Sequence, residues 1–227
     1  MTGRVFAAQR RIRLSDTDAS GRLRLDAVAR YLQDVAADDV ADAGWSPDEH
    51  VWVVRRTHVD VEAPFRSDAA VELRTWCSGV AGAAAARRYS LAGDAGGRIE
   101  AESVWIHLDH DLQPLRLGER FLAVYGPSAD GRRASTRLEL PPAPLDSARP
   151  WPLRATDVDR LGHVNNAAYW IPVEEAWNGR LSEPAGILLE YRRPIDLGDE
   201  VAVEQTENAL WLRVGADVRA AAAILPR

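Results

Sequence analysis

Apolar residues recur at steps of three and four positions between residues 25 and 44, which is the spacing of one face of an α-helix. The apolar positions are Leu25, Val28, Leu32, Val35 and Ala36. Asp26 stands where a side chain can cap the start of a helix, and Gly44 stands where a helix commonly ends. The pattern predicts one amphipathic helix of about five turns.

The other apolar segments are short and rich in valine, tryptophan and threonine, which is typical of β-strands. We expect strands at 51–62, 71–78, 85–92 and 98–109, and again at 186–191, 200–206 and 209–223. One long helix among several strands is buried by wrapping the sheet around it, and two such sheets can pair at their edges. The pattern therefore predicts a pseudo-symmetric α+β fold.

A short internal repeat supports this duplicated arrangement. Residues 13–21 align without gaps with residues 154–162, at an offset of 141. Four aligned pairs are identical, namely Arg13 with Arg154, Asp16 with Asp157, Asp18 with Asp159, and Gly21 with Gly162. In both parts a helical stretch follows, and then an apolar strand that runs into Pro64 or Pro194. The repeat predicts the same elements in each half.

A proline-rich stretch separates the two copies. Residues 126–150 show little apolar periodicity and contain Pro127, Pro141, Pro142, Pro144 and Pro150. Such a composition is typical of a linker. We therefore expect an N-terminal half at 1–125, a linker at 126–150 and a C-terminal half at 151–227.

Charge and composition narrow the class of protein. The formal net charge of −6 disfavours nucleic-acid binding, which favours basic surfaces. A lone cysteine, Cys77, excludes an internal disulfide, and we expect it to be a buried core thiol. The sequence contains neither a secretory signal pattern nor an apolar run long enough to span a membrane, so we expect a cytoplasmic location.

The two copies diverge directly after their shared turn. The second copy continues with His163, Asn165 and Asn166, where the first copy has Arg22, Arg24 and Leu25. Asp and Asn are common turn formers and helix caps, so the second copy can also be explained as turn chemistry. The first copy, however, builds its turn and helix without the histidine or the asparagine pair. We therefore expect the chemistry to lie in the second half.

A carboxylate before a helix suits a reaction in which a carbonyl group is attacked and negative charge develops on its oxygen. Asp159 can attack or activate water, while backbone N–H groups of residues 162–165 at the helix entrance can bind the oxygen. Glycine at 162 lets a substrate approach the backbone closely. His163 orients Asp159 or acts as the base itself, and Asn165 or Asn166 binds water or the carbonyl. The sequence leaves these roles open.

These residues resemble a known family. The run Asp157-x-Asp159-x-x-Gly162-His163-Val164-Asn165-Asn166-x-x-Tyr169 resembles the signature of hotdog-fold thioesterases. From Arg11 to about Val203 the chain resembles the acyl-ACP thioesterases of plants and bacteria. Supporting segments are Tyr31-Leu-Gln, Trp52-Val-Val, Thr75-Trp76, Arg87-Arg88, Ser103-Val-Trp105 and Leu189-Glu-Tyr-Arg-Arg193.

The resemblance implies a double-hotdog fold, hydrolysis of fatty acyl-ACP to free fatty acid, and no metal or cofactor. It places the family's catalytic aspartate on Asp159 and its histidine on His163. We expect catalytic roles for Asp159, His163 and Asn165, with supporting roles for Asp157, Gly162, Val164, Asn166, Tyr169 and Glu175. A catalytic asparagine of the plant enzymes falls on Leu161, and a Glu-Cys pair falls on Pro194 and Ile195. Either Asp159 and His163 suffice, or activity is lost.

The second helix carries a rival carboxylate pair. Glu174 and Glu175 could act from the central helix, and the alternative is that both are exposed and solvated. Pro172 in the same stretch predicts a kink or an early break, because proline removes a helical hydrogen bond.

The expected partners are acyl carrier protein, which is acidic, and the fatty acyl chain. Arginine clusters could meet the carrier, namely Arg10, Arg11 and Arg13, Arg132 and Arg133, and Arg192 and Arg193. Coenzyme A would use similar arginines, so an acyl-CoA thioesterase or a dehydratase of the same fold is an alternative. A catalytically silent acyl-thioester binding protein is another. The fused halves could serve as a monomer or form a homodimer.

Overall fold

The computed structural model describes residues 3–46, 51–143, 148–181 and 184–226. Within them, ten strands form one antiparallel sheet in the order β1-β3-β4-β5-β2-β7-β10-β9-β8-β6. The strands of the first half are β1 (Phe6–Arg11), β2 (Val51–Ala63), β3 (Ala70–Ala81), β4 (Ala84–Gly93) and β5 (Arg98–Leu108). Those of the second half are β6 (Ala148–Trp151), β7 (Ala185–Tyr191), β8 (Val201–Gln205), β9 (Ala209–Val214) and β10 (Asp217–Leu225).

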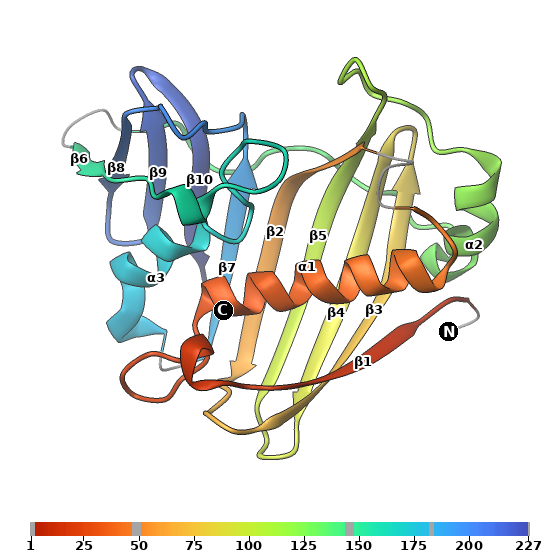
Figure 1. The fold of residues 1–227 in the computed structure, drawn as a ribbon, viewed down its shortest axis with the longest axis horizontal. Helices are drawn as coiled ribbons and strands as arrows, with labels where there is room; N and C mark the ends of the chain where they lie inside the picture. The colour runs from red at the N-terminus through yellow and green to blue at the C-terminus, as the bar shows by residue number, and fades with distance from the viewer. Residues whose placement is uncertain (1–2, 47–50, 144–147, 182–183, 227) are drawn as a thin grey trace.

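Three α-helices accompany the sheet in these ranges. α1 (Leu25–Asp42) crosses the strands of the first half, α3 (Trp170–Trp177) lies against the second half, and α2 (Glu119–Ala129) packs beside β3 (Figure 1). Short 3-10 turns stand at η1 (Leu14–Asp16), η2 (Ala155–Asp157) and η3 (Asn178–Arg180). The predicted apolar face of α1 is buried at Leu25, Val28, Leu32 and Val35. This burial confirms the helix that the spacing predicts.

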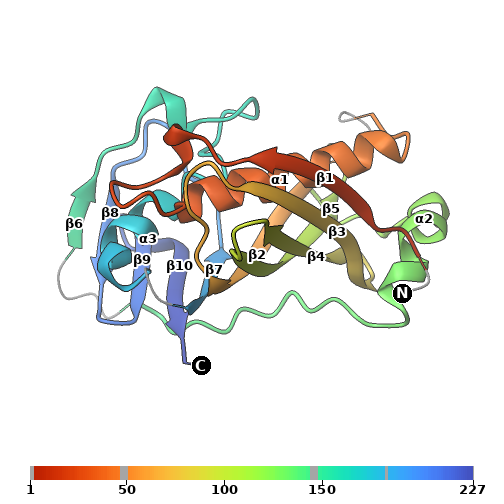
Figure 2. The ribbon, with the colours of Figure 1, turned by 90° about the horizontal axis from the view of Figure 1, so that it is seen from below.

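The two halves join at β2 and β7, as the α+β double-hotdog prediction requires. Arg56 pairs with Glu190 and Val61 pairs with Ala185, in an antiparallel register. One apolar core runs through both halves. The segment after α2 runs along the face of the sheet opposite α1 (Figure 2). It covers the buried Glu190, whose carboxylate accepts the N–H groups of Glu139 and Leu140, the latter at 3.0 Å.

The internal repeat is also a repeat of structure. In the first copy the N–H of Asp18 donates to the carbonyl of Arg22 at 2.9 Å, and the N–H of Gly21 donates to the carbonyl of Asp18 at 3.0 Å. The second copy forms the same two bonds at the 141-residue offset, with the same distances, between Asp159 and His163 and between Gly162 and Asp159. Gly21 and Gly162 have φ angles of +79° and +83°, which glycine adopts without steric cost.

Some expectations for individual elements are wrong. The single strand expected at 209–223 is two strands, because Gly215 with φ of +58° turns the chain between β9 and β10. α2 was not predicted and extends to Ala129, within the expected linker. The expected linker also includes residues 144–147, which lie outside the described residues. Among the described residues, those at 130–143 have neither helix nor strand.

The ends of two helices also differ from expectation. Asp26 does not cap α1; its carboxylate binds the side chains of Arg24 and Arg30 instead. α3 has only eight residues, so the second helix is short. Pro172 lies in the first turn of α3, where a missing N–H breaks no helical hydrogen bond. The kink expected at this proline is therefore absent.

Candidate active site

A cavity of about 590 Å³ lies between α1 and the sheet of the first half. Most of its wall consists of small apolar side chains of α1 and β4, together with aromatic rings. Among the described residues, those from the second half that line it are Asp159, Arg160, Leu161 and Asn166. The volume is in the range of small-molecule sites, and the carboxylate of Asp159 stands at one end.

Asp159 is held by the turn of the second copy. Its Oδ1 accepts the N–H of Leu161 at 2.8 Å, and its backbone N–H donates to the carbonyl of His163. Its other carboxylate oxygen has no hydrogen-bond partner within the described ranges. The half-buried carboxylate therefore presents an oxygen that is able to accept a proton at the cavity wall.

His163 lies beside this cavity wall but does not line it. Its Nδ1 is 2.5 Å from Oδ1 of Asp196, and the two side chains are 45% and 60% exposed. The sequence did not single out Asp196, although it follows Pro194 and Ile195 directly, where a family carboxylate is missing. The sequence signal that could have identified Asp196 is that it is a carboxylate two residues after Pro194, where the family has a glutamate.

The two asparagines have different environments. Asn165 serves the turn, since its Oδ1 accepts the N–H of Ala167 and its own N–H donates to the carbonyl of Asp157, both at 2.8 Å. Asn166 lines the cavity, and neither its side-chain amide nor its backbone N–H has a partner in the part of the chain that the structure describes. Asn166 is therefore better placed than Asn165 to bind a substrate.

Three of the expected supporting residues, Asp157, Val164 and Tyr169, build the loop instead of lining the cavity. Asp157 is buried and accepts the N–H of Arg154 at 2.9 Å. Val164 is buried and donates its N–H to the carbonyl of Ile195. The hydroxyl of Tyr169 accepts the N–H of Ile195 at 3.1 Å, and burial raises the pKa of this tyrosine.

The oxyanion donors expected at residues 162–165 are mostly occupied. The N–H groups of Gly162, Val164 and Asn165 donate to the carbonyls of Asp159, Ile195 and Asp157. Because the turn needs these bonds, the amides are not available to a substrate. Within the described residues the N–H groups of His163 and Asn166 have no acceptor, and of these two residues Asn166 lines the cavity.

The first copy shows what such an amide can bind. The N–H of Leu25, which corresponds to Asn166 at the 141-residue offset, donates to a carboxylate oxygen of Glu174 at 2.9 Å. Glu174 is buried and also pairs with Arg22, so the expectation of a solvated carboxylate is wrong for this residue. Glu175 is exposed and does not line the cavity. At the same offset Glu174 corresponds to Gln33, which lines the cavity together with Asn166.

The far end of the cavity is formed by aromatic and charged groups. Arg87 lines it and forms ion pairs at 2.6 Å with Asp39, which also binds Arg4. Cys77 lines it too and is buried, as expected, and burial raises the pKa of its thiol. Such a thiol is a weak nucleophile.

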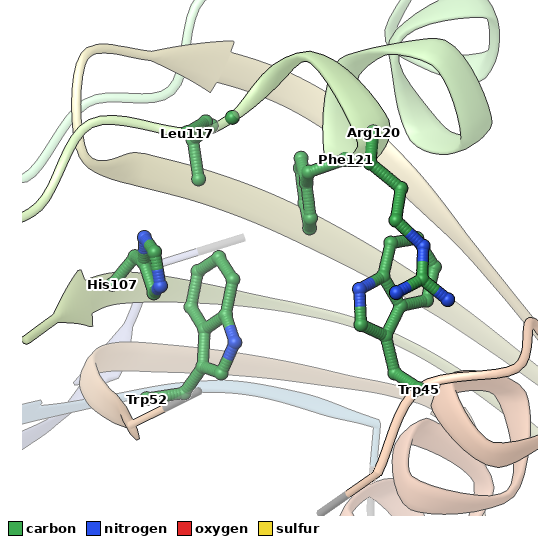
Figure 3. A pocket seen from close by; sticks show the side chains of 7 residues that line it. Trp45, Trp52, His107, Leu117, Arg120 and Phe121 are labelled. Atoms are coloured by element: carbon green, nitrogen blue, oxygen red, sulfur yellow. The ribbon is translucent and has the colours of Figure 1, made fainter. Parts of the chain in front are cut away.

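An aromatic wall separates this end from a second space of about 270 Å³. Trp45, Trp52 and Phe121 line both spaces. Figure 3 shows these three side chains with His107 and Arg120 around the second space, and the Arg120 guanidinium lies 4.5 Å from the Trp45 ring centroid. The main cavity and the second space therefore share an aromatic boundary.

Many of the arginines expected to meet a carrier have partners of their own. Arg10 pairs with Asp38 and Arg193 with Asp217, both at 2.9 Å, and Arg192 pairs with Glu190. No cluster of three or more potential metal-binding side chains occurs in the described residues. Within the same residues, none of the helices has both the length and the apolar character needed to cross a membrane.

Comparisons with known proteins assign both halves. Residues 3–124 match the model of the acyl-ACP thioesterase N-terminal domain, and residues 145–219 match that of the C-terminal domain. A Mycobacterium tuberculosis protein described as uncharacterized is 37% identical over 97% of this chain and 92% of its own length. Oleoyl-acyl carrier protein thioesterase 2 of Arabidopsis thaliana is 27% identical, over 81% and 59% respectively. The structure of the 12:0-ACP thioesterase from Umbellularia californica shares the fold, with a TM-score of 0.77 at 18% identity, covering 97% or more of both chains.

Proposed function

Because this chain belongs to the acyl-ACP thioesterase family and is a thioesterase, we propose that it hydrolyses fatty acyl-ACP to free fatty acid and holo-ACP. The observation that carries the proposal is the carboxylate of Asp159 at one end of the 590 Å³ cavity. The acyl chain occupies the cavity in the first half, and the thioester carbonyl lies beside Asp159 in the second.

In the proposed mechanism the partner-free oxygen of Asp159 takes a proton from water, whose oxygen then bonds to the carbonyl carbon. The negative charge moves to the carbonyl oxygen, which accepts hydrogen bonds from the N–H of Asn166 and the amide of Gln33. The C–S bond then breaks, and the proton held by Asp159 passes to the thiolate of the carrier. Neither the apolar Leu161 nor Ile195 takes part.

The first copy of the turn, in which a carboxylate accepts the equivalent N–H, supports placing the oxyanion at the N–H of Asn166. There an anionic oxygen of Glu174 accepts the N–H of Leu25, so an amide at this point of the turn can bind a negatively charged oxygen. In the second copy Gln33 replaces the glutamate, and the equivalent N–H of Asn166 has no protein acceptor among the residues described. Because the side chain of Gln33 is a neutral amide and not a carboxylate, the N–H of Asn166 stays available to a substrate.

We propose that His163 and Asp196 position the loop. Asp159 donates its N–H to the carbonyl of His163, and the imidazole is fixed by Asp196. We expect His163→Ala and Asp196→Ala to lower kcat by a similar factor, at most about tenfold, with the same loss in the double variant, because the two side chains act as one unit. Steady-state kinetics and pH–rate profiles of all three variants test this. A loss for His163→Ala as large as that for Asp159→Asn would instead place the imidazole in the chemistry.

The carrier is proposed to be ACP, with its phosphopantetheine arm entering near Arg160, an exposed arginine that lines the cavity next to Asp159. A thiol-release assay with matched acyl-ACP and acyl-CoA substrates over a range of chain lengths tests carrier and reaction together. We expect faster release from acyl-ACP. Faster release from acyl-CoA would identify an acyl-CoA thioesterase, and binding without release would identify a silent binding protein.

A further inference from the structure

A second, much smaller space adjoins the main cavity, and several polar side chains stand among its otherwise apolar lining. Its volume is about 20 Å³, and it shares Gln33, Trp105 and Asn166 with the main cavity. Thr57, Tyr89 and Ser103 also line it, as do Trp170 and Tyr191, whose polar groups bond to each other at 3.0 Å. We call this space the polar niche, and its remaining polar groups belong to Gln33, Asn166, Thr57, Tyr89, Ser103 and Trp105. Because Asn166 lines both spaces, the polar niche adjoins the end of the cavity at which Asp159 lies.

The polar niche contains hydrogen-bonding groups that the protein does not satisfy. Neither the hydroxyl of Tyr89 nor Nε1 of Trp105 has a hydrogen-bond partner of good geometry in the described structure, although Tyr89 is 0% exposed and its hydroxyl lies near Trp105 and Ser103. The hydroxyls of Thr57 and Ser103 bond to each other at 2.9 Å, which leaves one of their two protons available. Burial raises the pKa of Tyr89, so its hydroxyl stays protonated at neutral pH and can donate.

The size and polarity of the polar niche define what fits. A volume of about 10–15 Å³ is enough for one water molecule, so about 20 Å³ holds a single oxygen-sized group. A methylene group there would leave buried donors without partners, which is unfavourable, whereas an oxygen would accept from Tyr89 and Trp105. The polar niche therefore favours an oxygen atom over a carbon atom.

An acyl chain can supply this oxygen only close to its thioester. The third carbon of the chain lies two bonds, about 2.5 Å, from the carbonyl carbon that Asp159 and Asn166 would face. We propose that the polar niche binds an oxygen on this third carbon, and that the preferred substrates are β-hydroxyacyl thioesters. This inference rests on the proposed hydrolase function and narrows its substrate class.

The chain offers a matched control for Tyr89. Tyr125 is also a buried tyrosine with a hydroxyl that has no hydrogen-bond partner in the described part of the chain. Its side chain lines the main cavity at the α2 end and not the polar niche. Phenylalanine at either position removes one hydroxyl and no hydrogen bond, so both variants should fold. They differ in which part of the acyl chain they face.

The test compares kcat/KM for β-hydroxytetradecanoyl-ACP and tetradecanoyl-ACP, measured by thiol release. We expect the unmodified protein to prefer the hydroxylated substrate by about tenfold, the factor that about 1.4 kcal/mol represents. Tyr89→Phe should abolish most of this preference, and Tyr125→Phe should keep it. Equal kcat/KM values in the unmodified protein, or a preference that survives Tyr89→Phe, would overturn the proposal and indicate a water molecule in the polar niche.

A binding measurement separates this inference from the proposed function. Asp159→Asn should bind both thioesters with turnover too slow to consume them during the measurement, and calorimetry should give a lower Kd for the hydroxylated one. Adding Tyr89→Phe should make the two Kd values equal. If the unmodified protein releases no thiol but this difference in Kd is present and depends on Tyr89, the hydrolase proposal fails and the polar niche stands. Equal Kd values before Tyr89 is changed would overturn the polar niche, even where thiol release proceeds.

Discussion

We expect Asp159→Asn to lower kcat for acyl thioester hydrolysis by about a thousandfold, within the range typical for loss of a general base. Asparagine keeps the shape of the side chain and can still accept the N–H of Leu161 through its amide oxygen, so the turn should remain intact. The amide cannot take a proton from water. Steady-state kinetics with acyl-ACP measures the loss of kcat. A thermal melt of each variant checks that the fold is unchanged.

The first copy provides the control for this substitution. Asp18 occupies the equivalent position, but its carboxylate pairs with the buried Arg22 at 2.9 Å and does not line the cavity. Burial alone would raise the pKa of Asp18, yet hydrogen bonds from Ser20 and Arg22 lower it overall. The charged form therefore stabilises the fold at neutral pH, and this contribution is lost as the pH falls through the lowered pKa.

Asp18→Asn should thus lower the Tm and leave kcat within about twofold. Asp159→Asn should lower kcat and leave the Tm nearly unchanged. If Asp159→Asn retained nearly full kcat, or if both variants lost the same factor, the carboxylate at 159 would not be the base. Comparing the two substitutions separates a chemical role from a structural one, because the two backbone hydrogen bonds that each aspartate makes within its turn recur in the other copy.

The duplicated fold was predictable because its signals are local. The repeat at residues 13–21 and 154–162 predicted two equal turns, and alternating or apolar runs predicted most strands to within a few residues. The turn at Gly215 was missed because its glycine stands beside Ala216 and not in one of the Asn-Gly, Asp-Gly or Gly-Gly pairs that mark a two-residue hairpin turn. α2 was missed because its apolar residues pack around Trp45 and Cys77, which are distant in sequence.

The candidate site was predictable only on one side. Asp159 and Asn166 belong to a motif that is continuous in sequence, whereas Gln33 reaches them from the helix of the other half. That contact depends on how α1 and α3 pack against each other, which no local pattern encodes. The offset of 141 did contain a signal, because it aligns Gln33 with Glu174 and so pairs two polar residues on helices with mostly apolar faces.

We expect Arg22→Ala to lower the free energy of unfolding by about 3–5 kcal/mol, the cost of leaving a buried charge without its partner. Arg22 and Glu174 are 3% and 6% exposed, and their ion pair joins the first copy of the turn to α3 of the second half. Without Arg22, Glu174 keeps the N–H of Leu25 but loses its cation. For a chain of this size the Tm should fall by roughly 10 °C, as measured by calorimetry.

Two further variants test whether the loss comes from the buried ion pair: one removes an exposed ion pair, and the other replaces both members of the buried pair. Arg10→Ala removes the exposed pair with Asp38 and should cost at most about 1 kcal/mol. Arg22→Met with Glu174→Gln should recover much of the loss, since the buried charge of Glu174 is then removed together with its partner. Asp18 also loses Arg22 but keeps the N–H groups of Ser20 and residue 22. An equal, small Tm change for Arg22→Ala and Arg10→Ala would contradict the assignment. The ion pair of Arg22 with Glu174 would then not stabilise the contact between the two halves. The difference in sequence between the two copies would need another explanation.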